Sequence, residues 1–195
     1  MESTLKRTWA EIDLDALAHN YGRLRQHIGP KVRFLGVVKA DAYGHGAVQV
    51  ARTLQELGAD YLAVSSIDEA MELRANGVTM PVLILGHTPK EQVGRLIEHH
   101  ITQAVTCKAK ALEYSREAAA LGGTLKIHIK VDTGMSRLGT CATAVTLTAA
   151  WRASVRPAAC RGWRRRASSP TSPWPTSRTR RARPIPGGSL TCSAG

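Results

Sequence analysis

Five short apolar runs, each separated from the next by a segment of helical periodicity, constrain the fold of this chain most strongly. The runs comprise residues 33–39, 60–64, 81–85, 101–105 and 125–131. Three of the four segments between them end at Gly58, Gly77 and Gly122, and glycine is the usual left-handed cap at a helix C-terminus. Five β-α units in series predict a parallel sheet, built either as a (β/α)8 barrel or as a doubly wound sheet.

Two observations favour an incomplete barrel. No G-x-G-x-x-G sequence follows the first run, which argues against a dinucleotide-binding Rossmann half. A closed barrel needs eight strands, and five precede Gly139, so we expect an α/β fold in the form of a partial (β/α)8, TIM-like barrel. Residues 8–13 also have the pattern of a short strand before a helix over 14–28. Because the open edges and interior of such a sheet favour aggregation, we expect the chain to fold poorly.

Charge divides the chain at Gly139. Residues 1–139 hold all 15 acidic residues and 17 of the 27 basic ones, a formal net charge of +2. The remaining 56 residues contain ten arginines, no lysine and no acid, and they supply most of the total charge of +12. We therefore assign residues 1–139 to a partial barrel domain and residues 140–195 to a low-complexity, disordered tail.

The arginine-rich tail has two interpretations. Arginines interspersed with serine, proline and tryptophan can bind nucleic acid. Alternatively, the reading frame shifts after Gly139. Synonymous codons exist for Arg165 to Arg178 that, read from the third base, encode E-G-I-F-T-H-F-A-V-A-D-V-P, an apolar segment suited to a barrel. This recovery of an apolar pattern favours an out-of-frame product, and we expect no nucleic-acid partner.

Other sequence signals concern compartment and metals. The N-terminal residues lack the apolar stretch of a signal peptide, and no run is long enough to span a bilayer, so we expect a cytoplasmic protein without a membrane partner. The four cysteines form no C-x-x-C pair and have no metal-ligand spacing. We therefore expect unpaired thiols and no metal site.

Lys39 ends the first apolar run, where V-V-K-A-D-A-Y-G-H-G enters a glycine-rich loop. The carboxyl ends of barrel strands form the active-site face, and desolvation there can lower the pKa of a lysine and make its amine nucleophilic. A lysine that extends to solvent fits this position equally well. Tyr43 lies between small residues and can donate its hydroxyl to a phosphate, whereas we expect His45 to be structural.

The last apolar run continues into I-H-I-K-V-D-T-G-M-S-R-L-G, residues 127–139. Strand alternation places His128, Lys130 and Asp132 on one face, so these polar side chains are expected to point into the barrel. Buried charges need partners, and Lys130, Asp132 and Arg137 are available to one another. Arg137, beyond the strand end, can bind an anionic oxygen of a cofactor or substrate. A purely structural charge network is the alternative.

Taken together, the two motifs resemble those of the alanine racemases. V-V-K-A-D-A-Y-G-H-G precedes K-V-D-T-G-M-S-R-L-G by about ninety residues, in the order that a β-α series predicts. The opening W-A-E-I-D-L-D-A-L-A-H-N-Y also fits, so the resemblance extends over residues 8–139. It implies a pyridoxal-phosphate-dependent isomerase of fold type III that acts as a homodimer. Such an enzyme interconverts L-alanine and D-alanine and supplies D-alanine for peptidoglycan.

The resemblance also implies roles for individual residues. Lys39 would bind the cofactor covalently through its amine and act as the catalytic base for the α-proton of the D-enantiomer. Tyr43 would bind the cofactor phosphate, and Leu85 and Val37 would line the pocket. Arg137 would contact the phenolic oxygen of the cofactor and the substrate side. Lys130 matches a lysine that is carbamylated in many members and there becomes an anionic partner of that arginine.

Parts of the family pattern have no counterpart in these 195 residues. Racemisation needs a second proton-transferring group, which in the family is a tyrosine from the C-terminal β-domain of the partner subunit. The shifted-frame segment G-I-F-T-H-F-A resembles the next barrel strand of the family, including its histidine. The resemblance therefore implies a truncated, inactive chain that lacks the C-terminal β-domain. The alternative function is a non-catalytic pyridoxal-phosphate-binding barrel, although such proteins do not carry this pair of motifs.

Overall fold

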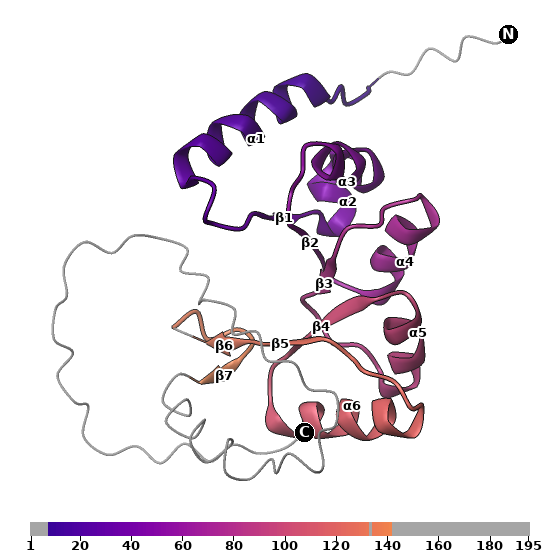
Figure 1. Ribbon diagram of the computed structural model, residues 1–195. Coiled ribbons are helices and arrows are strands. Elements are labelled where there is room, and N and C mark those ends of the chain that lie inside the picture. The colour runs from indigo at the N-terminus through magenta and orange to yellow at the C-terminus, as the bar shows by residue number, and fades with distance from the viewer. Residues whose placement is uncertain (1–7, 133, 142–195) are drawn as a thin grey trace, which may run out of the picture.

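Figure 1 shows the computed structural model, which describes residues 8–132 and 134–141. Its centre is a five-stranded sheet in the order β1-β2-β3-β4-β5, and all four neighbouring pairs are parallel. The strands are β1 Leu35–Val37, β2 Tyr61–Val64, β3 Val82–Ile84, β4 Ile101–Val105 and β5 Ile127–Ile129. Each crossover returns the chain to the next strand of the sheet. This sequential order confirms the prediction of a partial (β/α) barrel.

With the exception of α2, the helices fill the intervals that the sequence assigned to them. They are α1 Leu14–Ile28, α2 Lys39–Gly44, α3 Ala47–Glu56, α4 Ile67–Ala75, the 3-10 helix η1 Lys90–Gln92, α5 Val93–Glu98 and α6 Lys108–Ala120. The predicted caps Gly58, Gly77 and Gly122 have φ values of 76°, 80° and 63°, in the left-handed region that glycine tolerates. None of the helices in the described part of the chain is long and apolar enough to cross a membrane.

Helices α3 to α6 cover one face of the sheet (Figure 1). Alternate strand residues, such as Leu62, Val64, Val82 and Ile84, are buried in the main apolar core on this side. Because side chains alternate across a strand, the residues between them face the other way. The sheet therefore has one face that is packed against helices and one that corresponds to the interior of a barrel.

The interior face carries a smaller apolar cluster. Ala63, Leu83 and Ala104 are buried there, and Tyr61 and Leu85 pack against them. On β1, Leu35 and Val37 alternate with buried neighbours and remain 39% and 40% exposed. These two side chains are exposed because only part of the barrel wall surrounds them among the described residues.

Two strand predictions are wrong in detail. Residues 8–13 form no strand; instead, Asp13 caps α1 by accepting hydrogen bonds from the N–H groups of Asp15 and Ala16 at 2.9 and 3.0 Å. A strand needs a partner, and no described strand pairs with this segment. The run over 125–131 is also divided, because β5 ends at Ile129. Beyond it, β6 Val131–Asp132 pairs with β7 Thr140–Cys141 in a separate two-stranded sheet.

The division into a barrel domain and a tail stays a prediction. Residues 142–195, which make up nearly all of the predicted tail, lie outside the described residues. The same holds for the Arg165 to Arg178 segment on which the frame-shift interpretation depends.

Gly86, which follows β3, allows two chain segments to approach closely. A Cβ atom at this position would overlap the carbonyl oxygen of Ser65 at the end of β2. We therefore expect Gly86→Ala to lower the free energy of unfolding by about 1–3 kcal/mol, measured by urea denaturation. Gly94→Ala is the matched control, because its new Cβ would lie 3.6 Å from Leu121 in ordinary contact. In the α5 helix this alanine should stabilise the protein by about 0.5–1 kcal/mol. Equal effects of the two changes would contradict the steric argument.

Candidate active site

The carboxyl ends of the parallel strands bring three of the predicted site residues to one edge of the sheet. Lys39 lies two residues beyond β1, Leu85 follows β3 directly, and Lys130 follows β5 directly. Arg137 is exposed in the loop between β6 and β7. In barrels this edge carries the catalytic residues, because the loops after each strand converge there.

Lys39 begins a turn of left-handed helix that the sequence did not predict. Ala40, Asp41, Ala42 and Tyr43 have φ values of 51°, 52°, 50° and 56°. Left-handed helical geometry costs about 1–2 kcal/mol for each residue that carries a Cβ atom. The turn is closed by hydrogen bonds from Ala42 N–H to the carbonyl of Val38 at 2.9 Å and from Gly46 N–H to that of Asp41 at 3.0 Å. Backbone strain of this kind persists where surrounding contacts impose it, and it is common at functional sites.

Two carboxylates connect this turn to the neighbouring helices, one from a residue of the turn itself and one from α4. The Oδ1 atom of Asp41 accepts a hydrogen bond of 2.6 Å from the N–H of Ala47, the first residue of α3. The Oε1 atom of Glu69, on α4, accepts one of 2.8 Å from Ala40 N–H. Burial alone would raise the pKa of Glu69. Hydrogen bonds from the backbone of Ala40, Ser65 and Ser66 and from the Ser65 hydroxyl more than offset this effect, so the pKa of Glu69 lies below its usual value. The group that binds the turn is therefore an ionised carboxylate.

The turn places Lys39 and Tyr43 beside each other. The Nζ atom of Lys39 lies 5.8 Å from the centroid of the Tyr43 ring, within the range of a cation–π contact. Lys39 is half-buried, whereas Tyr43 is 63% exposed. His45 contacts the carbonyl of Ala42 through Nδ1 at 3.0 Å, in agreement with the structural role expected for it. An amine and a phenol therefore share the end of β1.

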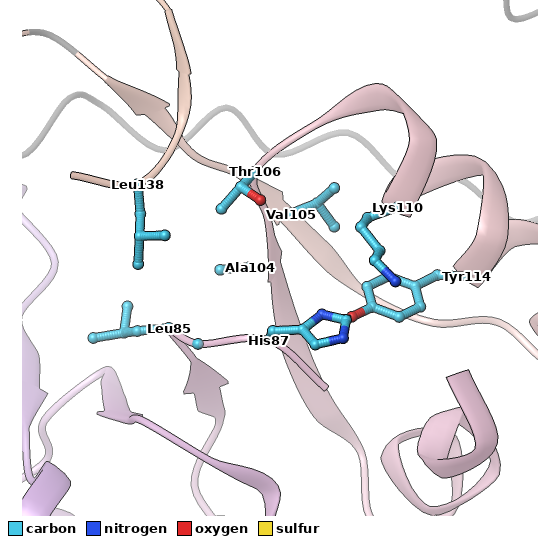
Figure 2. Close-up of a pocket in the computed structure, with 9 residues that line it drawn as sticks. Leu85, His87, Ala104, Val105, Thr106, Lys110, Tyr114 and Leu138 are labelled. Atoms are coloured by element: carbon cyan, nitrogen blue, oxygen red, sulfur yellow. The ribbon is translucent and has the colours of Figure 1, made fainter. Parts of the chain in front are cut away.

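A small pocket opens between the ends of β3 and β4 and the start of α6 (Figure 2). Its volume is about 60 Å³. Leu85 and Leu138 form one side, while His87, Lys110 and Tyr114 lie on the opposite side. Leu138 is the neighbour of Arg137, so the loop after β6 contributes to the same edge as Leu85. The Lys110 amine is paired with Glu113 at 2.6 Å.

Beneath this pocket lies a buried polar network that the sequence did not indicate. Tyr114 donates its hydroxyl to the carbonyl of Thr88 at 2.5 Å and lies 3.3 Å from Nδ1 of His87. Thr88 in turn donates its hydroxyl to Gln103 at 2.6 Å. Burial raises the pKa of the Tyr114 phenol, so the phenol stays protonated and serves as a donor. The network fixes the loop after β3 to α6 and thereby shapes the pocket wall.

The fifth strand agrees with its predicted alternation only in part. The His128 ring packs 5.8 Å from that of Tyr61, a residue of the interior cluster, so His128 faces the interior as predicted. Asp132 was expected to pair with Arg137 or Lys130. Instead, its carboxylate accepts hydrogen bonds from the N–H groups of Gly134 and Ser136 at 2.9 and 3.0 Å. A short carboxylate binds its own loop more readily than a distant side chain. Lys130 contributes to Asp132 only through longer-range attraction.

The ion pairs of the described region do not include Lys39, Lys130 or Arg137. They are Arg25–Asp60 and Lys110–Glu113, and the His99 ring also lies 4.0 Å from the Glu98 carboxylate. The structure thus brings Lys39, Tyr43, Leu85 and Lys130 to one edge but does not join Arg137 to either lysine. A lysine amine, a phenol donor and an apolar wall are groups that can hold an aromatic aldehyde bearing an anionic substituent.

Comparisons with known proteins agree with this geometry. Residues 12–162 match the family described as "Alanine racemase, N-terminal domain". The alanine racemase of Desulfosudis oleivorans is 47% identical over 150 residues, which cover 77% of this chain and 38% of the relative. The alanine racemase of Desulfovibrio desulfuricans is 46% identical over 139 residues and is matched over 38% of its length.

Solved structures give the same result. The alanine racemase from the D-cycloserine producer Streptomyces lavendulae superposes with a TM-score of 0.69 at 38% identity, over 77% of this chain and 40% of that one. The Clostridium difficile 630 enzyme gives a TM-score of 0.66 at 42% identity, over 70% and 36%. This chain therefore spans well under half the length of these relatives. Its fold, its motifs and the matched region agree, and the chain belongs to the alanine racemase family, of which it carries the N-terminal domain.

Proposed function

We propose that residues 1–139 are the N-terminal barrel portion of a pyridoxal-phosphate-dependent alanine racemase, an isomerase that interconverts L-alanine and D-alanine. The observation that carries this proposal is Lys39 at the start of a strained left-handed turn, beside Tyr43, at the carboxyl end of β1. The relatives named alanine racemase, at 45–47% identity over much of the same region, support it.

The residues at this edge fit pyridoxal phosphate. The half-buried Lys39 amine can bind the aldehyde, and the exposed Tyr43 hydroxyl can donate to the phosphate. Leu85, Leu138 and Val37 offer apolar surface to the ring. When bound, pyridoxal phosphate withdraws electrons from the amino acid and makes its α-proton acidic.

The chain's own residues would then have distinct tasks. The Nζ atom of Lys39 removes or returns the α-proton on one face of the substrate. The apolar side chains exclude water, so that the proton is not lost to solvent. Arg137 binds anionic oxygens at the same edge, and a carbamylated Lys130 would give it an anionic partner.

The choice of alanine as the substrate rests on the relatives. Among the solved structures, a histidine racemase from Leuconostoc mesenteroides is 28% identical with a TM-score of 0.66. A similar barrel portion therefore also occurs in a protein that is named for a different amino acid, histidine. The higher identity to proteins named alanine racemase, 42% for the Clostridium difficile structure, favours alanine here.

The rest of the proposal concerns the chain as a whole. Residues 140–195 are proposed to be an out-of-frame product, and a homodimer in the cytoplasm that supplies D-alanine for peptidoglycan is proposed for the intact enzyme. We further propose that the 195-residue polypeptide by itself is inactive, because its described residues offer Lys39 on one face of the substrate and no partner for the opposite face.

Covalent capture of the cofactor tests the proposal. We expect the 195-residue chain to turn yellow with pyridoxal phosphate and, after borohydride reduction and peptide mapping, to carry the pyridoxyl group mainly on Lys39. Lys39→Ala should abolish this labelling. Lys126→Ala is the matched control, because Lys126 is exposed just before β5, at the opposite edge of the sheet. Equal labelling of the Lys39→Ala and unchanged chains would refute the assignment.

A further inference from the structure

One carboxylate joins the ends of two neighbouring strands beside the candidate lysine. The Oε1 atom of Glu69 accepts the N–H of Ala40, the residue after Lys39, at 2.8 Å. Its Oε2 atom accepts both the N–H and the hydroxyl of Ser65, just beyond β2, at 2.6 and 2.8 Å. All three donors thus point to a single side chain that lies 29 residues away from Ala40 along the chain.

The α4 and β2 side of this contact is firmly held. The Ser66 side chain caps α4 by accepting Glu69 N–H at 3.4 Å, and the next residue, Ala70, is completely buried. The carbonyl of Ser65 packs so closely on Gly86 that a Cβ atom there would overlap it. Glu69 and Ser65 are therefore fixed by a helix cap, the core and a tight backbone contact. The segment that can move is the one that carries Lys39.

That segment is intrinsically unstable. Four successive residues with Cβ atoms adopt left-handed geometry. Without other contacts, these residues would favour right-handed or extended conformations. The first residue of the turn, Ala40, donates its N–H to Glu69. Its second residue, Asp41, is tied to the start of α3 through Ala47 N–H. Both carboxylates thus connect the first half of the turn to a neighbouring helix, and of these two only Glu69 links it to a second strand.

We propose that Glu69 is a positioning residue: its carboxylate holds the left-handed turn that presents Lys39 and Tyr43 at the carboxyl edge of the sheet. It acts through the backbone of Ala40 and needs no contact with a ligand. The meaning of this role for catalysis rests on the proposed function, whereas the existence of the clamp does not.

Amide hydrogen exchange of the 195-residue chain, followed by nuclear magnetic resonance, tests the clamp without any cofactor. Glu69→Ala removes the acceptor and retains a good helix former. Because hydrogen bonds to charged groups are strong, exchange at Ala40 and Ser65 should become about tenfold faster or more. Exchange at Ala42, whose N–H bonds to Val38 within the turn, should accelerate as well. Leu62 and Leu85, which bond across the sheet, should remain protected.

Two further variants complete the comparison. Glu69→Gln keeps the size of the side chain but replaces one acceptor oxygen by an NH2 group, so either Ala40 or Ser65 should lose protection. Glu72→Ala is the matched control, because Glu72 is exposed three residues later on the same helix. It should leave exchange at all of these amides unchanged.

The outcomes separate the possibilities. Faster exchange at Ala40 and Ser65 with an unchanged Ala42 would reduce Glu69 to a local bond and overturn the positioning role. Loss of protection across β2 to β4 in both Glu69 variants would make it a general structural residue and would overturn the positioning role as well. Unchanged exchange at Ala40 would show that the clamp does not form.

Pyridoxal phosphate capture then links the clamp to the lysine. If Glu69→Ala loses protection in the turn, we expect its borohydride-trapped pyridoxyl label at Lys39 to fall by about tenfold relative to Glu72→Ala. Equal labelling of these two variants would mean that the turn does not position the lysine. An unchanged chain that takes no label at Lys39 would refute the proposed function and leave the exchange result as the test of the clamp.

Discussion

The purified 195-residue chain is expected to form no measurable D-alanine from L-alanine. Racemisation moves a proton to and from both faces of the substrate α-carbon, which takes two proton-transferring groups. The described residues offer Lys39 for one face, and the chain spans 38% of the length of its Desulfosudis relative. A chain whose reading frame is restored after Gly139 should racemise alanine. D-alanine can be followed with a D-amino-acid oxidase assay.

Within the restored chain, Lys39→Ala should lower kcat by about 10²–10⁴-fold, the usual contribution of a positioned acid or base. Lys126→Ala, which changes an exposed lysine at the other edge of the sheet, should leave kcat unchanged. D-alanine formation by the unrestored chain would disprove its inactivity. If sequencing of the gene across Gly139 found an intact reading frame throughout the tail, the frame-shift proposal would be wrong.

Leu62→Ala is expected to have the largest effect on stability. Leu62 lies in the middle of β2, is completely buried, and belongs to the core between the sheet and its helices. Replacing a buried leucine by alanine costs about 2–5 kcal/mol through lost burial and the cavity left behind. This loss is comparable to the whole stability of a small domain, so the variant should lack a cooperative urea transition at 25 °C.

A leucine outside the core provides the comparison. Leu121, at the end of α6, is 58% exposed, and its replacement by alanine should change the free energy of unfolding by less than about 0.5 kcal/mol. If both variants unfolded at the same urea concentration as the unchanged chain, the core described for β2 would not exist in solution.

The order of elements was accessible from the sequence because it follows from local chemistry. Apolar runs became β1 to β5, and the glycines at 58, 77 and 122 became left-handed helix caps. The same local reasoning failed for residues 8–13 and for the run over 125–131. Whether an extended segment becomes a strand depends on a partner, and the partner is supplied by the rest of the fold.

The sequence likewise predicted part of the candidate site and missed the rest. Lys39 was expected where the first apolar run ends, and it lies two residues beyond β1; Lys130 was expected within the last strand and lies just after β5. Glu69 was missed, although S-S-I-D-E contains the S-x-x-E pattern of a helix capping box. That pattern predicts a role for Glu69 within its own helix, and it contains no information about Ala40. Likewise, nothing in K-A-D-A-Y-G indicates a left-handed turn, because residues with Cβ atoms avoid that geometry when free.

The sequence by itself therefore determined the parallel β-α order, the family and the edge of the sheet at which Lys39 lies. Periodicity, glycine caps and the two motifs are local signals, and they survive in any context that allows the strands to pair. Only the tertiary structure decided the shape of the turn after Lys39 and the bond between Glu69 and Ala40. These features cost energy locally and exist because contacts from distant residues offset that cost, which a local pattern cannot record.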